Sequence, residues 1–171
     1  NKKSNNTNFA LLVSKTFTEP FNNSNEYGEA IIRLSNMLGG GAIVQRYGDL
    51  IRGKRTTKDR LARNTVTPTL NAEPGDLSLV LPKRILDDIV EMIERLDHLV
   101  PGMVNDDNLL FGVEAKFYNF TVNVNKDFSD EDFPGLYFIG DGAGITHSLS
   151  QASANGLYVG AKIAETLKEE K

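Results

Sequence analysis

The sequence predicts an α+β fold: a mixed or antiparallel sheet of about four to six strands with two or three long helices. Three observations predict it. Apolar residues recur at spacings of four and three over residues 82–100, as on one face of a helix. Apolar and polar residues alternate over 120–125, as in a strand. Short apolar runs at 9–13 and 136–139 stand between turn-rich segments, as buried strands do.

The first elements are a strand and a helix. Residues 9–14 are predicted as a buried strand, followed by a loop rich in Asn and Pro. A helix is expected next, with Ser24 or Asn25 as its cap and acidic residues in its first turn. Three consecutive glycines at 39–41 end it.

The middle of the chain combines a long loop with the clearest helix. Residues 45–80 give no regular pattern, and a loop of this length is usually either functional or wrongly assigned as a loop. Within it we expect a short helix at 58–63, capped by Thr57. Pro82 suits the first turn of the helix at 82–100, and Pro101 with Gly102 terminates it.

The last third is predicted to contain three strands and a final helix. The strands are expected at 109–115, 117–125 and 136–139, with an acidic loop before the third. The helix is expected from about residue 148 to the end.

Composition excludes several classes of protein. The net charge of −4 does not favour general binding of polyanions. The absence of Cys excludes disulfides, thiolate metal sites and cysteine nucleophiles, and no metal site is predicted. No apolar run is long enough to span a membrane, and no signal peptide opens the sequence. A cytoplasmic location is therefore expected. The chain starts without Met and reaches an apolar run by residue 9, so we expect it to be a fragment of a longer polypeptide.

The segment YFIGDGAG, residues 137–144, is the main candidate binding element. It leads from a predicted strand through a glycine-rich turn towards a helix. Glycines allow a ligand to approach the backbone, and helix N-termini favour anionic groups. A carboxylate at the strand end adds an acceptor for hydroxyl groups. The glycine spacing does not match the dinucleotide-binding motif GxGxxG, so a purely structural turn stays open at this point.

The final helix has one face with almost no side chains, formed by Ala152, Gly156, Gly160 and Ala164. A glycine inside a helix costs about 1 kcal/mol relative to alanine. This face therefore predicts close docking of the helix on a sheet or a cofactor.

The ending GLYFIGDGAGITHSLSQASANGLYVGAKIAE resembles the C-terminal flavin-binding signature of FAD-dependent oxidoreductases. More widely, the chain resembles the C-terminal part of an uncharacterised family of FAD-dependent dehydrogenases or NAD(P)/FAD-dependent oxidoreductases. The supporting stretches are NFALLVSKTFTEPF, LSNMLGGGAIVQRYGDLIRGKRTT, LPKRI and LLFGVEAKFYNF.

This resemblance implies a cofactor and a domain organisation. It implies that FAD is bound by the turn, through Gly140, Asp141, Gly142, Ala143, Gly144 and Ile145. Residues 1–132 would be a substrate-side portion, and residues 133–171 the closing strand–turn–helix of a Rossmann-like FAD domain. The unit for the ADP half of FAD is missing. The resemblance therefore implies that the N-terminal FAD-binding region of the same polypeptide is the partner. Alone, the chain is expected to lack FAD, to be inactive and to self-associate.

The resemblance is imperfect after the glycines. The family pattern there is close to Thr-Arg-Gly-Leu, whereas this chain has Thr146, His147, Ser148 and Leu149. His147 is either a titrating group beside the flavin or a surface or capping residue. His98 is expected to be structural.

The long loop carries a local excess of positive charge. Seven basic residues lie between residues 45 and 64, against only two aspartates. Three interpretations stay open: a site for an anionic substrate or NAD(P), a nucleic-acid contact, or a solvated loop. A nucleic-acid contact is disfavoured because only Tyr47 offers a ring for stacking. The residues proposed for an anion or substrate are Arg46, Arg52, Lys54, Arg55 and His147.

No catalytic residue is assigned from the sequence. Glu114 in a strand is either a general base or an outward residue paired with Lys116. The expected function is that of a fragment of an FAD-dependent oxidoreductase acting on an unknown small molecule. The alternative is a non-catalytic binding or assembly module that contacts an anionic partner through residues 46–63.

Overall fold

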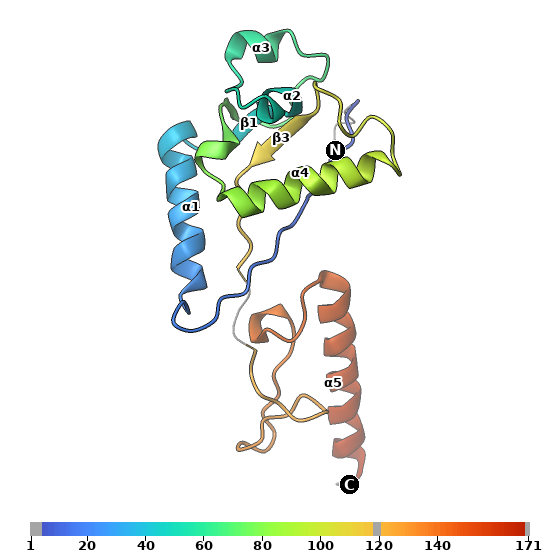
Figure 1. The fold of residues 1–171 in the computed structure, drawn as a ribbon. Coiled ribbons are helices and arrows are strands. Elements are labelled where there is room, and N and C mark those ends of the chain that lie inside the picture. Colours follow the sequence, from blue (N-terminus) through green and yellow to red (C-terminus); the bar gives the residue numbers. More distant parts are fainter. Residues whose placement is uncertain (1–4, 118–120, 170–171) are drawn as a thin grey trace. The chain divides into compact units, whose positions relative to one another are not determined.

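The computed structural model describes residues 5–117 and 121–169. These residues form an α+β fold, as predicted, with five α-helices and one three-stranded sheet. The chain divides into two compact units, residues 1–115 and 116–171. Figure 1 shows the first unit in blue to yellow and the second in orange to red.

Most of the regular structure belongs to the first unit. It contains α1 (Ser24–Gly39), β1 (Ile43–Arg46), α2 (Tyr47–Ile51), α3 (Lys58–Ala62), β2 (Glu73–Pro74), the 3₁₀ turn η1 (Leu77–Leu79), α4 (Lys83–Asp97) and β3 (Leu109–Gly112). The second unit contains the 3₁₀ turn η2 (Asp141–Ala143) and α5 (Leu149–Glu169).

The sheet of the first unit is small and mixed. Its strand order is β2-β1-β3, with β1 parallel to β2 and antiparallel to β3. In the register of β1 and β3, Ile43 faces Gly112 and Arg46 faces Leu109. The central strand β1 is therefore paired on both edges. This pairing holds its C-terminal end, from which α2 and the basic loop continue, in a fixed position.

The core of the first unit lies against this central strand. Ile43, Leu77 and Val80 are buried, and they pack with half-buried apolar residues from α1, β3 and neighbouring segments. Tyr47 and Leu50 of α2 and Ile93 of α4 are also buried. Burial of these apolar side chains thus holds the C-terminal end of β1 in place, and the polar loop begins there.

A side-chain cap sets the N-terminus of α1. Asn23, rather than Ser24 or Asn25, is the N-cap, because its side chain accepts a hydrogen bond from the backbone N–H of Glu26 and donates one back to that glutamate. At the other end Gly40 has a φ of 65°, the left-handed conformation that glycine adopts without strain.

The second long helix is shorter than predicted. α4 begins after Pro82 and ends at Asp97 instead of residue 100. The Asp97 carboxylate accepts hydrogen bonds from the N–H groups of Gly102 and Val104, which close the following turn and lower the pKa of this side chain. Met92 and Val100, two of the apolar residues in the range predicted as this helix, are about half exposed.

Three predicted strands are absent or reduced. Residues 9–14 are irregular, and Phe9 and Leu12 are mostly exposed. Residues 118–120 lie outside the described residues, and 117 and 121–125 form no strand. Of residues 136–139 only Tyr137 forms an isolated bridge, to Ser129. An apolar run becomes a strand only when another strand accepts its backbone hydrogen bonds, and the described residues provide no such strand here.

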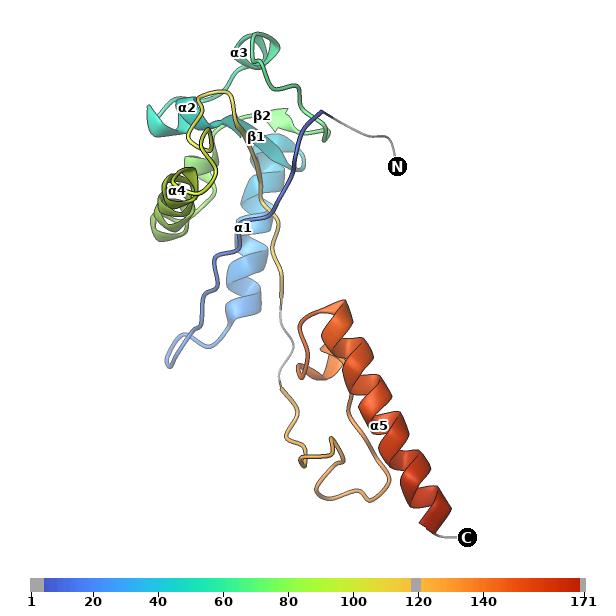
Figure 2. The same ribbon diagram turned by 90° about the vertical axis from the view of Figure 1, so that its right-hand side faces the viewer.

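The second unit consists of α5 and the loop that precedes it. Both views show α5 running beside this loop (Figures 1 and 2). The contact includes an edge-to-face pair between Phe128 and Tyr158, with ring centroids 5.9 Å apart. Asn155 and Val159 are the buried residues on the inner face of the helix.

A membrane-spanning helix is absent from the described part of the chain, since none of its helices combines the necessary length and apolar character.

Candidate functional site

The glycine-rich turn of the second unit has the conformation that its glycines permit. Gly140 has a φ of 77° and Gly144 a φ of 67°, both in the region that strains other residues. Among the residues that the structure describes, a Cβ atom built at Gly140 or Gly142 would meet no heavy atom within 4 Å. One side of the turn is therefore open, and its backbone can be approached closely.

Side chains hold this turn on its other side. Asn155 of α5 accepts a hydrogen bond of 2.9 Å from the Gly140 N–H, and the Thr146 hydroxyl donates to Oδ1 of Asp141. Val122 N–H donates to the Ala143 carbonyl at 3.1 Å. These hydrogen bonds hold the turn to α5 through Asn155, to Thr146, which follows the turn, and to Val122, which precedes it in the sequence.

The six residues predicted to bind the cofactor divide into two groups. Ala143 and Gly144 are buried, and Ile145 is half-buried. Gly140 is half-buried, and Asp141 and Gly142 are exposed on the open side. The other carboxylate oxygen of Asp141, Oδ2, accepts no hydrogen bond from the residues that the structure describes.

Ser148, which stands where the flavin-binding pattern expected from the sequence has glycine, has a structural role. The Ser148 hydroxyl accepts a hydrogen bond from the Gln151 N–H, and the Gln151 side chain accepts one from the His147 N–H. Ser148 therefore caps α5, in an arrangement close to a capping box. The Ser-x-x-Gln pattern could have revealed this cap from the sequence. His147 is exposed at this end of the helix.

The basic loop of the first unit is organised by buried polar groups. Thr56 and Gln45 are fully buried, and Asp49 is 4% exposed. The Thr56 hydroxyl donates to Asp49 at 2.8 Å and accepts from the Arg46 N–H at 2.9 Å. Gln45 donates to the Lys54 carbonyl and accepts from the Leu77 N–H. These bonds fix the loop against β1.

Carboxylates neutralise most of the cations in this loop. Arg46 pairs with Asp107 and Asp49, and Arg52 pairs with Asp106 at 2.6 Å. Arg60 pairs with Asp49 at 3.2 Å, and Lys58 with Glu73 at 3.1 Å. The open positive patch expected from the sequence is therefore largely used within the fold.

Only part of the predicted anion site stays available. Arg46 is held by Asp107, whose pKa is lowered to about 2 by hydrogen bonds from Thr65 and Arg46, and the same pairing raises the pKa of Arg46. Lys54 and Arg55 are exposed, and their side chains form no ion pair with the described residues. His147 belongs to the other compact unit.

Glu114, predicted to lie within a strand, is outside the observed strand. β3 ends at Gly112, and Glu114 is exposed two residues beyond it. His98, expected to be structural, is an exposed residue at the end of α4. No group of three or more metal-ligating side chains is found in the described ranges.

The sequence reasoning missed the residues that shape the turn. Asn155 and Thr146 were not singled out, although both are buried and both bond the turn. Asn155 also keeps a buried Nδ2 group with no hydrogen-bond partner in the described residues. The only signal in the sequence for the role of Asn155 was its position as a polar residue within a helix of small side chains.

Comparison with known proteins gives one informative relationship. The chain is 30% identical over 170 residues to an uncharacterised protein of Clostridium beijerinckii (strain ATCC 51743 / NCIMB 8052). The match covers 94% of this chain and 31% of that protein, so the chain spans about a third of the length of this relative. No family model matches the chain.

Proposed function

We propose that this chain is part of an FAD-dependent oxidoreductase and that the turn at Gly140–Gly142 binds the ribityl–pyrophosphate region of FAD. The observation that carries the proposal is the open, glycine-lined side of this turn, with the Asp141 carboxylate on it. The sequence resemblance of residues 135–165 to a flavin-binding signature supports the same assignment.

The residues present fit such a group. Glycines at 140 and 142 leave space for a phosphate or a sugar against the backbone. Oδ2 of Asp141 is an acceptor for a ribityl or ribose hydroxyl, while Oδ1 is held by Thr146. Because Thr146 and Asn155 fix the turn, these groups are positioned before a ligand arrives.

The cofactor would supply the redox chemistry, namely hydride or electron transfer through the flavin ring. The role of this chain would be to hold and orient it. The ADP half of FAD needs a separate glycine-rich unit, which we propose to be the N-terminal FAD-binding region of the same polypeptide. The isolated chain would accordingly bind FAD weakly and be inactive.

The basic loop contributes less to the proposal than its sequence indicated. Lys54 and Arg55 remain as candidates to contact an anionic substrate or the phosphate of NAD(P). The alternative function, a non-catalytic module that binds an anionic partner through residues 46–63, is weakened because Arg46, Arg52 and Arg60 are already paired.

The proposal is tested in the full-length polypeptide with Gly142→Val. The backbone at Gly142 is not left-handed, and an added Cβ meets no atom of the described residues within 4 Å, so the fold should tolerate valine. The side chain would occupy the space assigned to the cofactor. We expect the wild type to purify with flavin absorbance and the variant to lose at least tenfold in FAD affinity.

A matched control is Gly41→Val, since Gly41 has the same open surroundings in the other compact unit. It should leave flavin content unchanged. Asp141→Asn should weaken FAD binding severalfold, whereas Asp132→Asn, in the acidic loop before the turn, should not. A colourless wild-type protein that does not take up added FAD would contradict the proposal, and so would a Gly142→Val variant with normal flavin content.

A further inference from the structure

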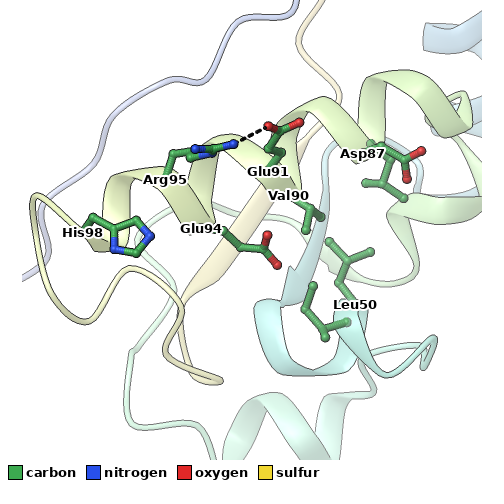
Figure 3. A pocket seen from close by; sticks show the side chains of 9 residues that line it. Leu50, Asp87, Val90, Glu91, Glu94, Arg95 and His98 are labelled. Carbon is green, nitrogen blue, oxygen red and sulfur yellow. Dashed lines mark hydrogen bonds and ion pairs between the residues drawn. The ribbon is translucent and has the colours of Figure 1, made fainter.

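A groove lies between α2 and α4 in the first unit, and the proposed function leaves it unused. It encloses about 750 Å³. Figure 3 shows α4 along one side and Leu50 of α2 on the opposite side, facing Val90. Leu50, Ile51, Leu86 and Val90 supply its apolar lining. Ile51 is 51% exposed, so this lining is accessible from outside.

Acidic residues form a row along the α4 side of the groove. Asp87, Glu91 and Glu94 follow one another at spacings of four and three residues, and His98 continues the row. Residues at these spacings lie on one face of a helix. From residue 87 to residue 98 the row extends about 16 Å, at about 1.5 Å per residue.

The carboxylates of this row differ in their partners. Asp87 pairs with Lys83 at 2.6 Å and Glu91 with Arg95 at 3.4 Å, both on the exposed surface. Solvent-exposed pairs of this kind are weak, so an incoming cation can replace them. Glu94 forms no ion pair with any residue that the structure describes, and Figure 3 shows it directed into the space between α4 and α2.

The charge of this row also acts on a buried tyrosine of α2. Tyr47, the first residue of α2, is 5% exposed. Burial raises the pKa of Tyr47, and the negative charges of Glu94 and Asp97 raise it further. Negative potential is thus concentrated near the Glu94 end of the row.

We propose that the α2–α4 groove binds an amphipathic helix of a partner protein. Its apolar side chains would lie on Leu50, Ile51 and Val90, and its lysines or arginines would pair with the carboxylate row. The argument is charge complementarity: an apolar strip bordered by carboxylates at helical spacing matches a helix with a leucine stripe bordered by cations at the same spacing. This inference is independent of the flavin proposal.

The test uses synthetic peptides with the 171-residue chain. One peptide, of about 18 residues so that it can form a helix, carries a leucine stripe bordered by lysines. A second has the same composition in scrambled order, and a third has glutamate in place of lysine. Fluorescence anisotropy of labelled peptides should show binding of the first and at least tenfold weaker binding of the other two.

Variants of the chain locate the binding. Glu91→Lys with Glu94→Lys should weaken binding of the first peptide at least tenfold, and Ile51→Ser several-fold. The control, Glu131→Lys with Asp132→Lys, changes the net charge equally at exposed positions outside the groove and should alter binding less than twofold. Glu94→Gln, a neutral change of similar shape, should weaken binding without affecting the fold, as checked by circular dichroism.

Three results would overturn the proposal. The first is that the lysine peptide does not bind. The second is that both double variants weaken it equally, which would show attraction by net charge alone. The third is that the glutamate peptide binds as tightly as the lysine peptide. The groove would then bind an apolar surface irrespective of charge, for example that of a second copy of the chain.

Discussion

Asp107 is the residue that does most to position the basic loop. Its carboxylate accepts hydrogen bonds from the backbone N–H and the hydroxyl of Thr65 and from Arg46, and its side chain is only 18% exposed. Asn64 links the same groups, since it accepts from Arg46 and donates to the Asp107 carbonyl. The Asp107 carboxylate, in the segment just before β3, thus links Arg46 at the start of the loop with Thr65 at its far end.

Replacing this carboxylate should reveal its contribution as a function of pH. The pKa of Asp107 is lowered from 3.8 to about 2, so its stabilising effect is complete above pH 3.8 and is lost as the pH falls through 2. We expect Asp107→Asn to lower the free energy of unfolding by about 2 kcal/mol at neutral pH. The difference from wild type should shrink towards zero at pH 2, as measured by denaturant titrations at several pH values.

Asp106→Asn is the control for this experiment. Asp106 pairs with Arg52, and both side chains are 52% exposed, so its loss should cost less than about 1 kcal/mol. A constant difference between wild type and Asp107→Asn from pH 4 to pH 2 would contradict the assigned pKa.

At the scale of elements, four of the five helices in the described residues were predicted (all but α2), whereas of the three strands only β3 was. Thr57 was identified as the cap of α3 from the sequence, and its side chain does accept a hydrogen bond from Arg60. Helix signals are local, because the caps and the apolar face lie within a few residues of each other. The runs at 9–13 and 136–139 have strand-like composition but no strand partner in the described residues, and partners are not encoded locally.

The same reasoning explains which part of the candidate sites could be predicted. The glycine turn was found because its signal lies in consecutive residues. The neutralisation of the basic loop was missed because the carboxylates lie far away in sequence: Asp107 is 61 residues from Arg46, and Asp106 is 54 from Arg52. The role of Asn155 was missed because its bond to Gly140 depends on how α5 lies against the turn.

The final helix gives a prediction of its own. Gly156 and Gly160 of α5 would meet no heavy atom if they carried a Cβ, so the described residues supply nothing that packs closely on them. In the 171-residue chain we expect Gly160→Ala to raise the free energy of unfolding by about 0.5–1 kcal/mol, because alanine is the better helix former. Denaturant unfolding followed by circular dichroism measures this.

The control for Gly160→Ala is Gly144→Ala, where the φ of 67° should make alanine destabilising. In the full-length polypeptide the effect of Gly160→Ala should reverse if another segment or the cofactor packs on this face, as its small residues indicate. A destabilising effect already in the 171-residue chain would mean that its Cβ position is not open.

For the whole molecule, the balance of buried and exposed apolar residues is unusual. Few large apolar side chains are buried, whereas Leu149 is 86% exposed, Leu157 77% and Leu99 79%. Residues 149–161, the first three turns of α5 and more, contain no charged residue. Exposed apolar surface without charge is typical of an interface, so the chain is expected to associate when nothing covers this surface.

Net charge should control this association. The chain carries a net charge of −4 at pH 7 and has a pI near 5.2, so electrostatic repulsion between copies disappears close to pH 5.2. We expect sedimentation experiments to show more self-association at pH 5.2 than at pH 8. Leu149→Gln with Leu157→Gln should reduce it, because it removes the most exposed apolar side chains of α5, whereas the control Ser150→Gln with Ser153→Gln on the same helix should not. Equal association of both double variants would place the contact elsewhere in the chain. A chain that stays monomeric at pH 5.2 would show that the exposed apolar surface of α5 does not cause association.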